Sequence, residues 1–521
     1  MTLCKHRTLN PAKAGFRYAQ HQTMNKLYNY IFGTKQLLIL AGITMLVFVL
    51  SLFNRYIYID DAWLGEQAFW FLQDGIARTE TIKDFQNWDI HLLVYHKATI
   101  AIGATLIGIF GWSVESLRIF TLVVYFIFFL VLFRFFRNNK TVFTSGHFVL
   151  AAFIIFFNPL TLLYSYTFRP EILVSLLGFS SFLFIDLFLV KSPKTRYLVF
   201  SGLLAGLSIL FHLNGLVFAV SGFLVLIFMR QLKPAIIFGF FAGIIASLYL
   251  IDLWQPGQMQ AYLDQLNNWP VPHAEHYSSG NFWDWLSTLL LKLLNEQQRF
   301  FWSYKVWGIS SLFIFALILK WKKVIKIKRH LLIYLIILIV SLNMLGSQIA
   351  ERYLLYYFPY MAIIIAIMIF DLRTKAKAWM QGTVISLLLL QTVCVGMGFY
   401  DIFNQNDDYV DQHEEILAMI PDKSAPVLVS YRFIFNALED RQLVTYKSFE
   451  YHQVELDRKL NQDEFLERAS DLGIKYIVIP REMLEGSDSR FPFLMDGKVD
   501  DNPYFEIHIE DTDFTILKSI K

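Results

Sequence analysis

Two adjacent aspartates, Asp60 and Asp61, are the first acidic residues of the chain and follow its first long apolar segment. A carboxylate at the boundary between apolar surroundings and water can have a raised pKa, which suits a general base near neutral pH. The same two residues could instead cap a helix over 62–73, which Asp74 and Gly75 would end. Capping and catalysis are both open here, since one carboxylate can cap while the other reacts.

A second group of polar residues follows in the segment WDIHLLVYHK, which holds Asp89, His91, His96 and Lys97. An aspartate and a histidine two residues apart can orient a general base, bind a metal ion or simply face water. All three interpretations stay open for Asp89 and His91.

A divalent metal could bind near these acids, although no motif requires one. His273 and His276 have metal-site spacing only on a helix, and Pro270 and Pro272 favour a loop there. The chain has no glycine-rich phosphate-binding loop and no serine-nucleophile motif, which argues against nucleotide-dependent and serine-hydrolase chemistry.

Further charged and polar residues lie in short turns that are far apart in the sequence. They are Arg118, Arg169 with Glu171, His212 with Asn214, and Glu351 with Arg352 and Tyr353. Any one of them could simply anchor a helix at a membrane interface. Together they could form a site, because one arginine can bind two phosphate oxygens at once and a nearby carboxylate can take a proton from a hydroxyl.

The composition requires a membrane setting for these turns. The chain is 55% hydrophobic and only 17% charged, with a mean hydropathy of +0.44, which is too apolar for a soluble globule. We therefore predict a mainly α, polytopic bundle of about 11 transmembrane helices. The expected spans are 36–53, 115–136, 147–166, 171–190, 197–211, 213–229, 235–254, 302–320, 331–347, 353–370 and 378–399.

Lysine and arginine gather in every second connection between these spans, which predicts a cytoplasmic N-terminus in a multi-pass plasma (inner) membrane protein. The tail 1–35 is then cytoplasmic, and the membrane domain 36–400 has large outer loops at 54–113 and 255–301. Residues 98–111 are apolar but too short to span, so we expect a short interfacial or re-entrant helix.

The C-terminal segment 401–521 differs from the rest in charge, with 26 Asp and Glu against 13 Lys and Arg. Such an acidic segment argues against nucleic acid as a partner. Residues 427–431 and 476–480 are expected to be strands, and 462–472 a helix that Gly473 ends. These elements predict a small extracytoplasmic α/β domain.

Five stretches of the sequence resemble a known family. They are DDAWLGEQAFWFLQDG after the first span, the end of loop one through Arg118, the turn FRPE around Arg169, the glycine-rich span that ends at His212, and ERYLLYYFPY from Glu351. Together they resemble the GT-C membrane glycosyltransferases, near the protein O-mannosyltransferase and lipid A aminoarabinose-transferase group. Two positions depart from that pattern: Leu92 and Leu93 replace a Pro-Pro pair, and His212 replaces a lysine.

The resemblance implies an inverting transfer of a hexose or pentose from a polyprenyl-phosphate carrier to an extracytoplasmic glycan, lipid or protein. Asp60 would be the general base, and Asp61 and Asp89 would assist it. The resemblance also implies that substrate is bound by His91, Arg118, Arg169, Glu171, His212, Arg352 and Tyr353. The alternative function is a flippase or transporter of lipid or lipid-linked sugar that breaks no bond, although the spans are nearly free of charge and show no repeat.

Overall fold

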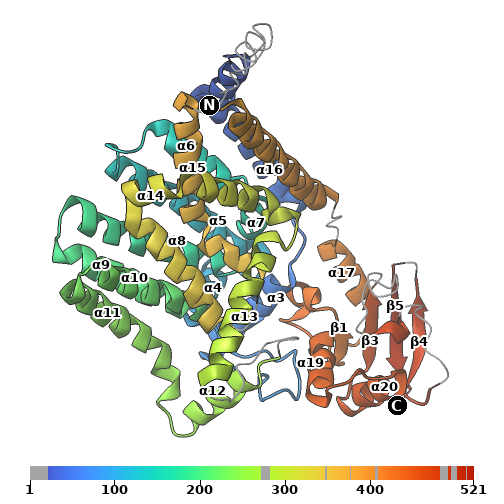
Figure 1. The fold of residues 1–521 in the computed structure, drawn as a ribbon. Helices are drawn as coiled ribbons and strands as arrows, with labels where there is room; N and C mark the ends of the chain where they lie inside the picture. The colour runs from blue at the N-terminus through green and yellow to red at the C-terminus, as the bar shows by residue number, and fades with distance from the viewer. Residues whose placement is uncertain are drawn as a thin grey trace, which may run out of the picture.

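The computed structural model describes residues 22–270, 282–346, 349–375, 377–404, 409–480, 491–494, 502–511 and 513–520. A bundle of helices carries a smaller unit built on a β-sheet beside one of its ends (Figure 1). This arrangement confirms the predicted fold class, a mainly α bundle followed by a small C-terminal α/β part. The proposed metal-like pair His273 and His276 lies outside the described residues.

In the part of the chain that the structure describes, five helical segments are long and apolar enough to cross a membrane, and all five were predicted as spans. They are Thr34–Asn54 (α2 and η1), Val114–Asn138 (α5), Glu171–Lys191 (α8 and the π-helical η2), Leu232–Leu253 (α11 and η4) and Ala378–Asn404 (α16). Shorter apolar helices pack with them: α4 (Lys97–Phe110), α6 (Ser145–Phe156), α9 (Thr195–Phe211) and η3 with α10 (Leu213–Phe228). The chain is therefore a multi-pass membrane protein, and the count of eleven spans stays a prediction.

Three of the predicted spans differ from the structure in their continuity. The segment 147–166 is broken, because Asn158 accepts a hydrogen bond from the Leu160 amide at 2.9 Å and Pro159 has no amide hydrogen. A new helix, α7 (Pro159–Tyr164), starts there. The spans expected at 302–320 and 331–347 instead lie in one long element, α14 (Tyr304–Leu345), whose backbone leaves the helical region at Lys328 (φ −145°, ψ 62°). The remaining helices of the bundle are α12 (Gln258–Asn267), α13 (Phe282–Phe301), η5 (Glu351–Tyr356) and α15 (Phe358–Lys375).

The first outer loop contains the helix that carries the paired aspartates, α3 (Ile59–Asp74), which ends at Gly75 with φ +79°. We predicted that Asp60 or Asp61 would be its N-cap, and this was wrong. The helix starts earlier than we predicted, and Tyr58 is its N-cap. Asp61 is the third residue of the helix, and its Oδ2 accepts a hydrogen bond from the Tyr58 amide at 3.2 Å.

The C-terminal unit is a five-stranded sheet with the order β2-β1-β3-β5-β4. The first three strands are parallel, while β5 pairs antiparallel to both β3 and β4. Its elements are α17 (Tyr409–Ala418), β1 (Val427–Val429), η6 (Tyr431–Phe433), α18 (Ile434–Ala437), β2 (Leu443–Thr445), α19 (Tyr446–Leu456), α20 (Gln462–Asp471), β3 (Tyr476–Pro480), η7 (Pro492–Leu494), β4 (Phe505–Glu510) and β5 (Phe514–Ser519). The predicted strands and helix of this part are found, and Gly473 follows α20 with φ +70°.

The C-terminal unit shares a hydrophobic core with the first outer loop. Trp88 and Phe85 of the loop belong to the same cluster of buried side chains as Val427 and Ile516 of the sheet. Backbone contacts join the two parts as well, since the Thr445 amide donates to the Thr81 carbonyl at 2.8 Å. The unit is therefore packed onto loop one and is not a freely hanging appendage.

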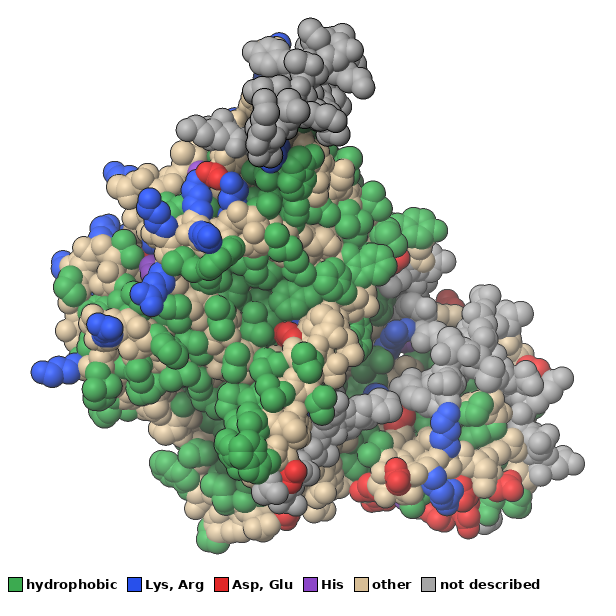
Figure 2. Space-filling view, viewed as in Figure 1, with side chains coloured by type: hydrophobic (Ala, Val, Ile, Leu, Met, Phe, Trp, Pro, Cys, Tyr) green, Lys and Arg blue, Asp and Glu red, His purple; other side chains and the backbone are tan. Residues whose placement is uncertain are grey.

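Charged side chains are unevenly distributed over the molecular surface. In Figure 2, lysines and arginines gather at the end of the bundle near the N-terminus, and acidic side chains gather over the C-terminal unit. A broad band of hydrophobic side chains lies between these two regions. This distribution is typical of a membrane protein with one basic end.

Candidate active site

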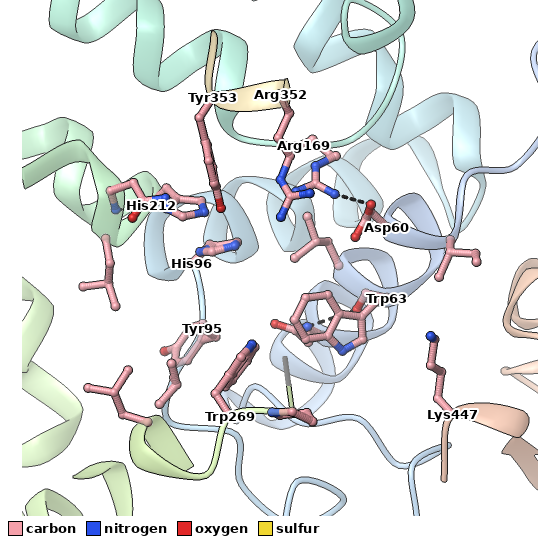
Figure 3. A pocket seen from close by; sticks show the side chains of 18 of the residues that line it. Asp60, Trp63, Tyr95, His96, Arg169, His212, Trp269, Arg352, Tyr353 and Lys447 are labelled. Atoms are coloured by element: carbon pink, nitrogen blue, oxygen red, sulfur yellow. Dashed lines mark hydrogen bonds and ion pairs between the residues drawn. The ribbon is translucent and has the colours of Figure 1, made fainter. Parts of the chain in front are cut away.

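A cavity of about 450 Å³ lies where loop one, the ends of several bundle helices and the C-terminal unit meet (Figure 3). Four of the predicted positions from distant turns line it: Asp60, Arg169, His212 and Arg352, with Tyr353 beside the last. The bundle therefore brings together side chains that are almost 300 positions apart in the sequence.

Asp60 is in the first turn of α3, and its side chain is 27% exposed. One carboxylate oxygen, Oδ2, forms an ion pair with Arg169 Nη1, and the carboxylate faces the cavity in Figure 3. Among the described residues, none donates a hydrogen bond to Oδ1. Asp60 thus has one oxygen that is held and one that is available to a bound molecule.

Glu171 is fully buried and holds two arginine side chains in place. Arg169 donates to it from Nε at 3.0 Å and from Nη2 at 2.6 Å, which is a bidentate pair. Arg352 Nε lies 3.4 Å from Oε1 of the same carboxylate. Glu171 does not line the cavity, so the structure places it behind the two guanidinium groups that do.

Asp61 and Arg118 form a closed pair beneath the cavity wall and do not line the cavity. Asp61 is fully buried, and Arg118 Nη2 donates to its Oδ2 at 2.6 Å. The Phe168 amide also donates to Asp61, while Arg118 donates to the carbonyl of Tyr56 at 2.5 Å. These bonds tie the start of α3 to α5 and to the turn that carries Arg169.

Two histidines stack face to face in the cavity wall, His96 and His212, with ring centroids 4.4 Å apart. Burial lowers the pKa of His96 to about 4 and lowers the pKa of His212 well below its usual range. His212 Nδ1 accepts from the Asn214 amide at 3.0 Å, so a neutral His212 carries its proton on Nε2. His212 can therefore donate a hydrogen bond without adding a charge.

Asp89 and His91 do not line the cavity. Asp89 lies 3.9 Å from Lys83 in a partly exposed ion pair. The His91 carbonyl accepts from Gln265 Nε2 at 2.9 Å, which fixes the loop backbone.

The short helix η5, which carries Arg352 and Tyr353, is held by the outer helix α13. Arg299 of α13 donates to the Ala350 carbonyl at 3.1 Å, just before η5, and to Glu296 at 2.9 Å. Glu296 also accepts from the Tyr357 hydroxyl at 3.2 Å. A buried pair on the outer helix therefore fixes the loop that delivers Arg352.

The sequence did not single out several lining residues. Trp63 follows Asp60 by almost one helical turn, so the spacing within α3 could have placed both on one face. Trp269 and the tail residues Lys447 and Tyr451 gave no such signal, because only the packing of distant segments brings them to the cavity.

The carboxylates at this site, Asp60 in the cavity wall and Glu171 behind it, are not arranged to bind a metal ion. Asp60 and Glu171 are both paired with Arg169, which supplies the positive charge that a metal would otherwise bring. In the part of the chain that the structure describes, no group of three or more His, Cys, Asp and Glu side chains is placed to hold a metal. The positive charge beside these carboxylates therefore comes from arginine side chains.

No protein-family model matches the sequence, and no curated protein matches it either. Solved structures are similar in fold. ArnT from Cupriavidus metallidurans, bound to undecaprenyl phosphate, superposes with a TM-score of 0.57 at 11% identity, over 93% of this chain and 98% of that one. The oligosaccharyltransferase AglB from Archaeoglobus fulgidus, in complex with an inhibitory peptide and a dolichol-phosphate, gives 0.50 at 12% identity, over 92% of this chain and 74% of that one.

These likenesses extend over more than nine tenths of this chain. The chain has the fold of the GT-C membrane glycosyltransferases.

Proposed function

We propose that this protein is an inverting glycosyltransferase that moves a hexose or pentose from a polyprenyl-phosphate carrier to an acceptor outside the cytoplasm. The observation that carries this proposal is the meeting of Asp60 with Arg169 and Arg352 in one cavity. A sugar phosphate needs cations for its phosphate, and the attacking hydroxyl needs a proton acceptor. The undecaprenyl phosphate bound to ArnT and the dolichol-phosphate bound to AglB support the class of donor.

Asp60 acts as the general base in this mechanism. Its free oxygen, Oδ1, takes the proton of the acceptor hydroxyl as that oxygen attacks the anomeric carbon of the sugar. The bond between the anomeric carbon and the phosphate oxygen breaks, and its electron pair goes to the departing polyprenyl phosphate. The pairing of Oδ2 with Arg169 fixes the carboxylate in position for this step.

Arg169 and Arg352 stabilise the negative charge that grows on the departing phosphate. Glu171 orients both guanidinium groups before the reaction, so little reorganisation is needed at the moment of bond breaking. His212 adds a neutral Nε2 donor at the same end of the cavity. We assign Asp61, Arg118 and Glu171 to positioning, since each is buried in the wall.

We further propose that the N-terminus is cytoplasmic and that the cavity and the C-terminal unit face the opposite side. The basic end of the bundle and the acidic C-terminal unit in Figure 2 support this orientation. A carrier lipid could then place its phosphate at the membrane boundary, next to the cavity.

The test compares Asp60→Asn with the wild-type protein in lipid nanodiscs. The donors are a panel of polyprenyl-phosphate-linked hexoses and pentoses, the acceptor source is an envelope lipid and glycan extract, and released polyprenyl phosphate is measured. Loss of the general base should lower turnover by about 10²–10⁴-fold. Asp74→Asn is the matched control, because Asp74 is on the same helix but pairs with Arg78 away from the cavity. A folded Asp60→Asn protein with wild-type turnover would remove Asp60 from the mechanism.

A further inference from the structure

The end of the cavity away from the arginines has a wall of aromatic side chains. Trp63 and Trp269 both line it, with ring centroids 5.9 Å apart. Trp88 is fully buried behind them, 6.3 Å from Trp63 and 4.7 Å from Trp269. The packing of Trp88 fixes both indole rings, so this wall exists before any molecule binds.

Polar side chains line the same cavity as the two indole rings. Gln67 lines the same cavity, and its amide donates to the Trp63 carbonyl at 3.2 Å. Lys447 and Tyr451 add an ammonium group and a hydroxyl to the same lining, so the cavity can pair the hydroxyl groups of a bound molecule.

This combination fits a sugar ring better than a lipid chain. A pyranose ring presents C–H groups on its faces, which pack on the electron-rich face of an indole, and hydroxyl groups at its edge, which need hydrogen-bond partners. A polyprenyl chain would need a continuous apolar groove, and the polar side chains that line this part of the cavity would then be left unpaired.

The C-terminal unit closes this end of the cavity. Lys447 and Tyr451 of α19 both line it, and Figure 3 shows the Lys447 side chain reaching toward the aromatic wall. Lys447 also donates to Glu450 at 2.5 Å, which restrains its ammonium group. The tail therefore supplies part of the surface that a molecule in this position would touch.

The position of the aromatic wall matches the approach of the acceptor. In an inverting reaction, the attacking hydroxyl arrives from the side opposite the leaving phosphate. The arginines occupy one end of the cavity, and Asp60 lies between them and Trp63 (Figure 3). Trp63 is three residues after Asp60, about 4.5 Å further along the helix axis, so a hydroxyl of a ring stacked on Trp63 can reach Asp60.

We propose that the acceptor is a saccharide, free or as the head of a glycolipid, whose ring stacks on Trp63 and Trp269 under Lys447 and Tyr451. This inference rests on the proposed transferase function and narrows its acceptor to a carbohydrate. A peptide acceptor becomes an outcome of the test.

The experiment measures binding of the labelled full-length protein, in nanodiscs, to arrays of immobilised glycans and of peptides. The wild-type protein should bind a subset of the glycans. Trp63→Ala and Trp269→Ala should each weaken that binding by about ten-fold or more, since one lost stacking contact has roughly this value. Trp63→Phe should restore most of it, because an aromatic face is kept.

Two controls separate binding from folding and from chemistry. Trp70→Ala removes a tryptophan from the same helix that does not line the cavity and instead stacks with Arg78 at 4.4 Å; this variant should bind like the wild type. Asp60→Asn should bind glycans normally while failing to transfer sugar. Thermal unfolding midpoints show that each variant is folded.

The inference is overturned if the wild type binds no glycan, if Trp63→Ala and Trp269→Ala bind glycans as the wild type does, or if only peptides bind through Trp63. Failure of the proposed function looks different: glycan binding would depend on Trp63, yet no polyprenyl-phosphate sugar would be consumed. Consumption of the donor with tryptophan-independent glycan binding would instead leave the function standing and remove the saccharide subsite.

Discussion

Helix α8 has a buried carboxylate at each of its ends. Glu171 opens the helix and lies against Arg169 and Arg352, both of which line the cavity. Asp186 closes the helix at the opposite end and is just as deeply buried. The two regions have the same ingredients, a carboxylate and its cationic partners within apolar helices.

The partners of Asp186 enclose it completely. Lys328 donates to it at 2.5 Å, Asn139 donates at 2.9 Å, and His330 Nε2 lies 2.7 Å away. Lys328 also donates to Asn139 at 2.7 Å, at the point where α14 leaves helical geometry. This closed cluster joins three segments of the bundle, and none of its four side chains lines the cavity that holds Asp60.

The difference between the two ends of α8 shows how to distinguish a candidate functional site from a buried cluster that only stabilises the fold. Burial and pairing are common to both, so neither property identifies chemistry by itself. What distinguishes the Glu171 end is that its partners are also part of a cavity wall, where they meet Asp60. The predictions that follow test this distinction, from the largest expected effect to the smallest.

Removal of both arginines at the Glu171 end of α8 should have the largest effect. Arg169→Ala combined with Arg352→Ala takes away the groups proposed to stabilise the leaving phosphate, each worth about 10²–10³-fold in turnover. We expect transfer to fall below detection and binding of polyprenyl phosphate to weaken. Turnover and lipid binding near wild-type levels would contradict the proposed role of this end.

Asp186→Ala should act on stability and not on chemistry. It leaves Lys328 buried without its carboxylate, which typically costs about 3–5 kcal/mol of folding free energy. We expect a lower thermal unfolding midpoint and less folded protein, with turnover per folded molecule unchanged. A stable Asp186→Ala protein that has lost turnover would instead place the closed cluster in the mechanism.

The contact between loop one and the tail should depend on pH through Glu66. This fully buried residue of α3 accepts from the Thr81 amide at 2.9 Å and from the Tyr431 hydroxyl, and burial raises its pKa to about 7. A raised pKa means that the folded state keeps the proton while the unfolded state releases it. The stabilisation is therefore complete below about pH 4.5 and is lost as the pH rises to about 7, by roughly 3 kcal/mol.

Glu66→Gln is the matched variant for this pH effect, because glutamine copies the shape of the protonated acid. Its unfolding free energy should change less between pH 5 and pH 7.5 than that of the wild type. Protease sensitivity of the C-terminal unit reports the same contact. Identical pH profiles for the two proteins would remove Glu66 as the cause.

Removal of the partly exposed ion pair in loop one should have the smallest effect. Asp89 and Lys83 lie 3.9 Å apart with both side chains partly exposed, and such pairs contribute about 1 kcal/mol or less. We expect Lys83→Ala to leave the unfolding midpoint within a few degrees of the wild-type value. A large loss of turnover in this variant would show that loop one acts on the site from outside the cavity wall.

The sequence predicted the charged and polar side chains near Glu171 better than the side chains of the aromatic wall. Asp60, Arg169, His212 and Arg352 could be grouped because a charged residue at a helix end must face the membrane boundary, and the alternation of basic loops indicates on which side. These four side chains line one cavity in the structure, and their roles are proposals.

The remainder depended on packing that no local pattern encodes. The hydrogen bond between Glu66 and Tyr431 joins positions 365 residues apart, and it helps to bring Lys447 and Tyr451 to the cavity. The two neighbours Asp60 and Asp61 look equivalent in sequence, yet the start of the helix turns one outward and the other into the protein. The break of α14 at Lys328 likewise follows from a partner, Asp186, that lies far back in the chain.

Helix α19 supplies two residues of the cavity wall, and this has a consequence for the synthesis of the protein. Every span precedes the tail in sequence, so the ribosome delivers Lys447 and Tyr451 only after the last apolar helix has entered the membrane. A partly made chain consequently has an incomplete pocket, and the wall of the cavity closes only once the C-terminal unit has packed onto loop one.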